Sequence, residues 1–119
     1  MARLNKRQAW AFGHKAETWA VWMLRLKGYR ILARRYKSRL GEIDIIAQRG
    51  SLISFIEVKG RRSAPLETPV TNGQMQRIAR TAQLFMQECS DVQNFDMCFD
   101  IILVRPWHWP DHQKDAWRP

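Results

Sequence analysis

Cysteine is scarce in this chain, and a long apolar segment is missing. The two cysteines, Cys89 and Cys98, are too few for a disulfide scaffold, and neither belongs to a C-x-x-C pair or has a histidine at zinc-finger spacing. We therefore expect two reduced thiols. The longest apolar run, at residues 101–104 with its flanks, is far shorter than the roughly 20 residues that cross a bilayer. These absences exclude a disulfide-stapled module and a transmembrane helix, and no membrane partner is expected.

Acidic residues are also in short supply. Eleven Asp and Glu face twenty Lys and Arg, which gives a net charge of +9. This balance favours polyanions, because phosphate contacts release counterions, and nucleic acid is the first partner to expect. Basic charge can also serve solubility alone. The basic residues 1–7 are followed by Gly13, His14, Lys15 and Glu17 rather than by the apolar stretch of a signal peptide, which predicts a cytoplasmic protein.

One domain is the expectation for 119 residues, which suffice for one hydrophobic core. We place it at residues 1–104. The remaining segment, residues 105–119, holds three of the six tryptophans and three of the five prolines, a composition that argues against regular structure. This tail either packs on the core or forms an aromatic contact arm that stacks on bases.

Apolar residues recur at helical spacing in two segments and enrich four shorter, strand-like runs. The face of the first helix that is expected to be buried consists of Ala16, Trp19, Ala20, Met23 and Leu24. In chain order we predict a helix over 9–27 capped by Gly28, strands over 29–36, 42–48 and 52–59, a loop over 60–68, a helix from Thr71 or Asn72 to about Cys89, and a strand over 95–104. This order predicts an α/β fold with an α-β-β-β-α-β core and a mixed sheet flanked by helices.

Charged residues interrupt the two apolar strands of the predicted hairpin. Side chains alternate along a strand, so Glu57 and Lys59 project from the same face. If residues 49–50 form a two-residue loop, Asp44 lies opposite Phe55, on the face of Glu57. A three-residue loop would instead send the acids to opposite faces. The predicted site therefore depends on the register of the hairpin.

Carboxylates gathered in this way need a partner. The same register puts Glu42 opposite Glu57. Two carboxylates about 4 Å apart repel by roughly 4 kcal/mol at an effective dielectric constant of about 20, so a cation or a proton must relieve them. Oxygen ligands without nearby Cys or His favour Mg²⁺, with Mn²⁺ as the alternative. Such a metal would activate water, while Lys59 would stabilise the developing negative charge or help to deprotonate that water, which predicts phosphodiester hydrolysis.

An ordinary surface is the competing interpretation. An E-x-K pattern on an exposed strand is common and by itself has no functional meaning. Apolar residues, however, occupy both faces of the two strands, so the charged side chains are expected at buried or cleft positions, where charges usually have functional partners. These apolar residues are Ile43, Ile45, Ile46, Ile56 and Val58.

The motifs together resemble a nuclease pattern. Asp44, followed by Glu57 and Lys59 on a hairpin and preceded by a helical Glu17, resembles the PD-(D/E)XK nuclease superfamily, whose core has the same α-β-β-β-α-β order. More closely, four segments resemble the bacterial YraN family of predicted endonucleases, which is similar to archaeal Holliday-junction resolvases. These segments are residues 17–20 (ETWA), 28–32 (GYRIL), 41–47 (GEIDIIA) and 55–59 (FIEVK), within a resemblance that covers about residues 13–104.

The resemblance implies a restriction-endonuclease-like fold and Mg²⁺-dependent cleavage of DNA. It assigns Glu17, Asp44 and Glu57 as metal ligands and, with Lys59, as the catalytic set. The last strand departs from the family pattern, because it reads Cys98-Phe99-Asp100 where Arg-Phe-Asp is expected. The four acid and lysine positions are retained.

Basic residues are candidates for phosphate contacts. The run from Arg34 to Arg39 is the strongest candidate, and Arg61 and Arg62 directly follow the strand that carries the E-x-K motif. Gln74 stands where the family has a basic residue early in the second helix; it can still bond a phosphate or a metal-bound water, or it is simply solvated. The predicted substrate-binding residues are Arg34, Arg35, Arg39, Arg61, Arg62 and Gln74.

Three functions are consistent with the sequence. The first is a metal-dependent DNA endonuclease that acts on branched, nicked or single-stranded DNA. The second is a catalytically inactive nucleic-acid-binding module in a repair or recombination complex. The third is an interaction protein that docks through residues 105–119. A homodimer would suit a junction-cutting enzyme, but the sequence does not decide the oligomeric state.

Overall fold

Five strands and two α-helices make up the described part of the chain. The computed structural model describes residues 6–60 and 70–119, with side chains from residue 15 onward. In chain order the elements are α1 (Lys6–Leu26), β1 (Arg30–Ser38), β2 (Gly41–Arg49), β3 (Leu52–Gly60), α2 (Asn72–Glu88), the 3₁₀ helix η1 (Ser90–Val92), β4 (Asp96–Val104) and β5 (Asp111–Trp117). The predicted order is confirmed through β4, and β5 follows it. The predicted loop after Gly60, over 61–68, lies outside the described residues.

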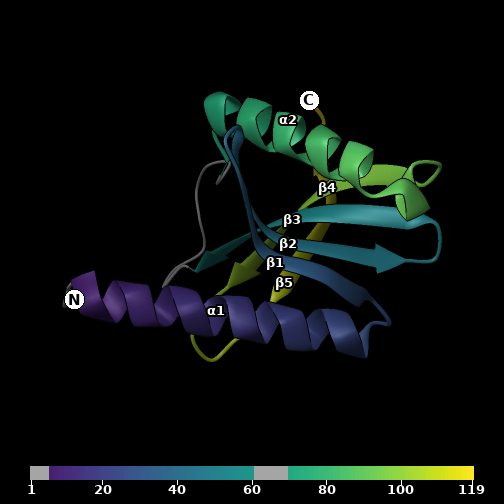
Figure 1. Ribbon diagram of the computed structural model, residues 1–119. Helices are drawn as coiled ribbons and strands as arrows, with labels where there is room; N and C mark the ends of the chain where they lie inside the picture. The colour runs from purple at the N-terminus through teal and green to yellow at the C-terminus, as the bar shows by residue number, and fades with distance from the viewer. Residues whose placement is uncertain (1–5, 61–69) are drawn as a thin grey trace.

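The strands form one mixed sheet that lies between the two helices (Figure 1). The sheet order is β1-β2-β3-β4-β5; β3 and β4 are parallel, and the other neighbours are antiparallel. A parallel pair needs a crossover connection, and α2 lies in that connection. One core cluster fills the space between the sheet and α1, and the other fills the space between the sheet and α2. The predicted α/β class with a mixed sheet flanked by helices is confirmed.

A Schellman motif ends α1. The Tyr29 N–H donates to the Leu24 carbonyl at 2.9 Å, and the Gly28 N–H donates to the Arg25 carbonyl at 3.0 Å. Gly28 has a φ of 90°, a left-handed conformation that glycine adopts without steric cost. The predicted cap is therefore confirmed, and it turns the chain back into β1.

The buried face of α1 is shifted from the predicted one. Trp19 was expected on this face but is 58% exposed, so that prediction was wrong. Val21 is buried instead, because the buried face of α1 is rotated around the helix axis, away from Trp19 and toward Val21. The other four predicted residues, Ala16, Ala20, Met23 and Leu24, are buried against the sheet as expected.

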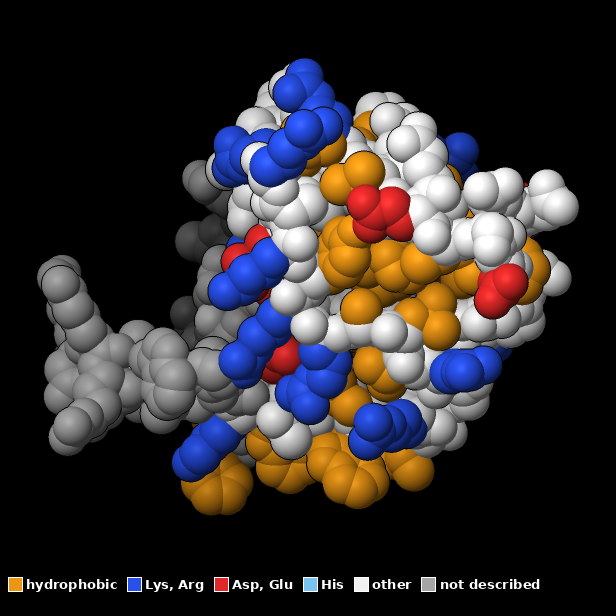
Figure 2. All heavy atoms as spheres, in the orientation of Figure 1, with side chains coloured by type: hydrophobic (Ala, Val, Ile, Leu, Met, Phe, Trp, Pro, Cys, Tyr) orange, Lys and Arg blue, Asp and Glu red, His pale blue; other side chains and the backbone are white. Residues whose placement is uncertain are grey.

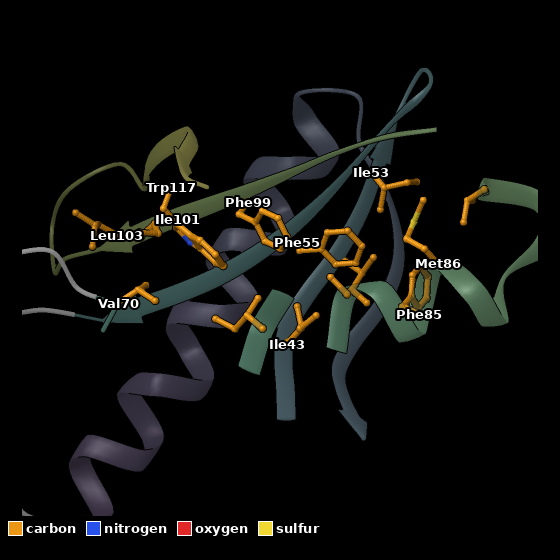
Figure 3. Close-up of a cluster of buried hydrophobic side chains, with 14 residues drawn as sticks. Ile43, Ile53, Phe55, Val70, Phe85, Met86, Phe99, Ile101, Leu103 and Trp117 are labelled. Atoms are coloured by element: carbon orange, nitrogen blue, oxygen red, sulfur yellow. The ribbon is translucent and has the colours of Figure 1, made fainter. Parts of the chain in front are cut away.

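A capping box begins α2. The Thr71 hydroxyl accepts a hydrogen bond from the Gln74 N–H at 3.2 Å, and the Gln74 side-chain oxygen accepts one from the Thr71 N–H at 3.4 Å. The buried face of this helix adds Phe85 to an aromatic core, in which the Phe55 ring lies 6.0 Å from Phe85 and 5.7 Å from Phe99 (Figure 3). Neither α-helix of the described residues is long and apolar enough to cross a membrane.

The β2–β3 hairpin has a different register from the predicted one. Arg49 pairs with Leu52, so the two-residue loop is residues 50–51 rather than 49–50. Gly50 has a φ of 61°, which is the conformation required at the first central position of a type II′ turn. This register brings Asp44 beside Glu57 instead of Phe55. Because the pairing moved by two positions, the acids stay on the face that was predicted.

The sequence suggested that the segment after Val104 has no regular structure, and this prediction was wrong for its second half. Residues 111–117 form β5, which pairs with β4 and extends the sheet. Its last residue, Trp117, is buried and stacks on Phe99 with ring centroids 4.4 Å apart (Figure 3). The alternative in which the tail packs on the core therefore holds for Trp117, whereas Trp107 and Trp109 remain exposed.

A chain of polar contacts centred on the buried Asp100 holds β5 and the residue after α1 to β4. His112 Nε2 lies 2.7 Å from Asp100 Oδ2, and His112 Nδ1 lies 2.6 Å from Lys27 Nζ. A carboxylate accepts and an ammonium donates, so the imidazole donates through Nε2 and accepts through Nδ1. The Asp115 N–H donates to the other Asp100 oxygen at 2.9 Å. Burial acts to raise the pKa of Asp100, but the hydrogen bonds from His112 and Asp115 outweigh it and leave the pKa below its usual value.

Replacing His112 by Ala should lower the free energy of unfolding by about 2–3 kcal/mol at neutral pH, because it removes the hydrogen bond that the imidazole donates to Asp100 Oδ2 and leaves that buried oxygen unpaired. Because the pKa of Asp100 is lower in the folded than in the unfolded chain, its carboxylate stabilises the fold at pH values above 3.8, the unfolded-state pKa. This stabilisation is lost as the pH falls through the lower, folded-state pKa. The cost of His112→Ala should therefore shrink in acid. Urea unfolding measures both effects. The exposed His108→Ala is the control, and equal stability of His112→Ala and wild type would contradict the assignment.

Candidate functional site

A pocket of about 410 Å³ opens between the end of the β2–β3 pairing and the first turns of α2. It brings together the charged residues that the sequence placed on one face of the hairpin. The lining consists of Glu42, Asp44, Glu57, Val58, Lys59, Gln74, Arg77 and Ile78.

Asp44 lies where β2 and β3 stop pairing. The ladder ends at Ile45 opposite Ile56, and beyond it the Val58 N–H donates to Asp44 Oδ2 at 2.8 Å. Ile43 and Ile45 belong to core clusters on opposite faces of the sheet, although residues two apart on a regular strand share a face. β2 is therefore twisted at Asp44, and the carboxylate takes a backbone donor that regular pairing would have used.

Glu57 and Lys59 project together toward α2. Phe55 belongs to the core under α2, whereas Ile56 and Val58 pack on the α1 side, so the alternation puts Glu57 and Lys59 on the α2 face. Glu57 is only 6% exposed, and within the described structure its Oε1 atom has no hydrogen-bond partner. A buried carboxylate oxygen without a partner carries a desolvation cost that a bound cation would offset.

Burial raises the pKa of both carboxyl groups. At Asp44 the Val58 N–H and the Lys59 ammonium oppose this effect, and the charge of Glu17 adds to it. At Glu57 burial, followed by the neighbouring Asp44 carboxylate, raises the pKa to about 8, although Lys59 acts in the other direction. The pair therefore retains a proton at neutral pH unless a cation takes its place.

The donor set fits a hard divalent cation. Asp44 and Glu57 offer carboxylate oxygens, one of them buried and unpartnered. Mg²⁺ is commonly held by one or two carboxylates, with water and substrate phosphate completing its shell. Among the described residues, no group of three or more His, Cys, Asp or Glu side chains converges closely enough to hold a metal ion. Asp44 and Glu57 are thus the adjacent pair of carboxylates in this pocket, and the exposed Glu42 lines it as well.

Glu17, the third acid that the resemblance assigned to the metal, has other partners. Its Oε1 accepts from Arg34 Nε at 3.2 Å, and its Oε2 accepts from Arg35 Nε at 3.0 Å. It is not among the described residues that line the pocket, and it reaches Asp44 only through its charge. The structure thus does not place Glu17 with the other two predicted ligands. Arg34 and Arg35, which were predicted to bind phosphate, form ion pairs with Glu17 instead.

The remaining predicted substrate contacts divide into three groups. Arg39 is exposed in the turn between β1 and β2, away from the pocket lining. Arg61 and Arg62 lie outside the described residues. Gln74 lines the pocket while its side chain also completes the capping box of α2. Arg77, one turn after Gln74, lines the same pocket and supplies the positive charge that Gln74 cannot.

The raised pKa of Glu57 predicts how stability depends on pH. The folded state keeps a proton that the unfolded chain releases near pH 4.5, so the free energy of unfolding falls as the pH rises from about 4.5 toward 8. This group contributes a slope of up to roughly 1.4 kcal/mol per pH unit. Glu57→Gln should remove this contribution to the slope and be more stable than wild type at pH 8. Urea unfolding at several pH values measures it.

The exposed Glu42, in the same pocket, provides the matched control, since Glu42→Gln should keep the wild-type slope. Parallel stability curves for wild type and Glu57→Gln between pH 5 and 8 would show that Glu57 is ionised in the folded state.

The sequence has relatives of nearly the same length. A protein of Mesorhizobium japonicum is 42% identical over 94% of this chain and 90% of its own length. A protein of Brucella canis is 46% identical over 92% of this chain and 88% of its own, and one of Rhizobium meliloti is 45% identical over 94% and 93%. All three are named UPF0102 proteins. Residues 16–104 match the same family, and the chain therefore belongs to the uncharacterised protein family UPF0102.

Proposed function

We propose that this protein is a metal-dependent DNA endonuclease that hydrolyses phosphodiester bonds. The observation that carries the proposal is the adjacent pair of Asp44 and the buried Glu57, which has an unpartnered oxygen and shares an open pocket with Lys59. A structural role alone does not account for two adjacent carboxyl groups with raised pKa values at the end of a strand pair. The order of elements and the E-x-K motif support a place in the PD-(D/E)XK superfamily, with similarity to Holliday-junction resolvases.

Each residue of the pocket has a distinct task in this proposal. Asp44 and Glu57 would hold Mg²⁺, or Mn²⁺, which when bound polarises the phosphate and lowers the pKa of water. The Val58 N–H fixes the orientation of the Asp44 carboxylate. Lys59, which faces the same pocket, stabilises negative charge that develops on the phosphate or takes part in removing a proton from the attacking water.

The wall of the pocket opposite the carboxylates suits a phosphate backbone. Gln74 lies in the first turn of α2, where the helix dipole is positive, and Arg77 adds a full charge. The net charge of +9 favours association with any nucleic acid, and DNA is the substrate we propose. A DNA substrate and two free thiols fit a cytoplasmic location.

One observation favours a second candidate, a binding module without catalytic activity. Glu17 is held by Arg34 and Arg35 and does not line the pocket, so one of the three ligands that the resemblance implies lies outside it. Such a module would bind nucleic acid in a repair or recombination complex and would do so without a divalent metal.

Cleavage of labelled DNA distinguishes the two candidates. Duplex, single-stranded, flap and four-way-junction DNA are incubated with Mg²⁺, Mn²⁺ or EDTA. Wild type should cut at least one of them in a metal-dependent manner, and both Asp44→Asn and Lys59→Ala should lower the rate by about 100-fold or more. The expected loss follows because the first change removes a ligand charge and the second removes the cation at the reacting phosphate.

Two exposed residues away from the pocket give matched controls, since Asp91→Asn and Lys114→Ala make the same chemical changes and should retain wild-type rates. Tight binding without cutting of any substrate would favour the inactive module. Cutting that survives both pocket substitutions would place the reaction elsewhere.

A further inference from the structure

The outer face of α1 is apolar as well as the inner one. Trp19 and Trp22 are each 58% exposed, and Leu26 is 72% exposed. Their spacing of three and four residues places them on one exposed stripe, with Trp19 at its border with the face that packs on the sheet. A surface of this kind on a soluble domain is usually a contact surface for a ligand or a partner.

Two further tryptophans are displayed by the connection between β4 and β5. The His108 N–H donates to the Arg105 carbonyl at 3.2 Å, which closes a turn with Pro106 and Trp107 at its centre. Trp107 has a φ of 65°, the left-handed conformation that favours Gly or Asn at this position. Its side chain is fully exposed, and Trp109 is 68% exposed. The turn thus holds a bulky ring in an unfavourable backbone conformation and buries none of it.

These two surfaces meet in one groove, which we call the tryptophan groove. It consists of two adjoining hollows of about 820 and 570 Å³ that share Lys15, Trp19, Trp109 and Pro110. In Figure 2 hydrophobic side chains gather along the edge of the molecule where α1 lies, with Lys and Arg side chains beside them. Four tryptophans, Trp19, Trp22, Trp107 and Trp109, line the groove.

The charge of the groove has one sign. Lys15 and Arg105 line it, whereas none of its described lining residues is Asp or Glu. The only acid in the described part of α1 from residue 15 onward is Glu17, which is buried and bound by two arginines. A groove with stacking surfaces and cations but no carboxylate is complementary to a flexible polyanion whose subunits carry flat rings.

We propose that the tryptophan groove binds unpaired nucleotides of a DNA strand. The bases stack on the indole rings, and the phosphates contact Lys15 and Arg105. A duplex keeps its bases stacked on one another and offers this groove only its backbone, so the groove selects single-stranded segments. A second copy of the chain is a poorer occupant, since each copy carries a charge of +9.

The groove would extend the proposed nuclease site rather than replace it. Lys15 and Trp19 lie on the same turns of α1 as Glu17, whose charge acts on Asp44. The groove lies on the outer side of α1, whereas the carboxylate pair opens toward α2. A substrate that occupies both would place an unpaired segment in the groove and a scissile phosphate at the pair, which would make DNA with unpaired segments the preferred substrate. This assignment of substrate rests on the proposed function, whereas binding by the groove does not depend on cleavage.

Binding in EDTA tests the groove independently of catalysis. The probe is a fluorescein-labelled oligothymidine of about 12 nucleotides, a length that a small domain covers, with a duplex of equal length for comparison. Trp109→Leu keeps an apolar side chain without a stacking face, and it should weaken single-strand binding by about 5- to 100-fold. Trp109→Phe should restore most of the affinity. Binding of the duplex should change little in either variant.

Trp107→Gly separates a ligand-binding role from a structural one. Glycine suits a φ of 65°, so this variant should melt at the same or a higher temperature than wild type and still bind the single strand more weakly. Equal losses for Trp109→Leu and Trp109→Phe, or unchanged binding in all three variants, would overturn the proposal. Trp-dependent binding to phosphatidylserine vesicles but not to the oligonucleotide would also overturn it and assign the groove to a membrane surface. If the wild-type protein cuts DNA in a metal-dependent manner but the tryptophan substitutions leave single-strand binding unchanged, the groove proposal fails and the proposed nuclease function stands.

Discussion

The pairing of β2 with β3 is the constraint on which the site depends. Gly50 adopts the left-handed conformation that a tight turn needs at its first position, and this fixes which residues of the two strands lie opposite each other. A slip of one residue would send every side chain of one strand to the other face. The buried isoleucines prevent such a slip, because Ile45 and Ile56 must enter the core under α1 together. Asp44 and Glu57 are brought together as a consequence of that packing.

Much of this arrangement could be predicted from the sequence because it depends on local rules. Side-chain alternation alone sets Glu57 and Lys59 on one face, and no register error affects that. Asp44 was predicted on the same face as Glu57, and this is correct although the loop assignment was wrong. A shift of two residues in the strand pairing leaves every side chain on its face. Of the two predicted caps for the second helix, Thr71 is the one that the structure has, and the predicted Gly28 cap ends α1, because both are local signals.

The unpredicted features come from contacts between residues that are distant in sequence. β5 has no alternating apolar pattern; it is anchored by Trp117 on Phe99 and by His112 on Asp100, and neither contact is visible in a single segment. Glu17 meets Arg34 and Arg35 because α1 packs beside β1, where Arg35 has a φ of 52°. Trp19 sits at the border of a helical stripe, where periodicity cannot decide between the core and the surface.

Three acidic side chains are buried among the described residues, and two of them have hydrogen-bond partners on both carboxylate oxygens. Glu17 is bonded to two arginines, and Asp100 is bonded to His112 and to a backbone amide. Glu57 is buried to the same degree, yet one of its oxygens has no partner and a second carboxylate lies beside it. Glutamine or an apolar residue at this position would avoid the cost of burying an ionisable group, which raises the pKa of Glu57 instead. A chain with twenty Lys and Arg has the means to neutralise the pair from the protein side, yet within the described residues Lys59 is the cation whose charge lowers the pKa of both carboxyl groups. Retention of a carboxyl group without a partner for one oxygen, where the chain pairs the others, is the physical argument behind the proposal that this pair serves a ligand rather than the fold.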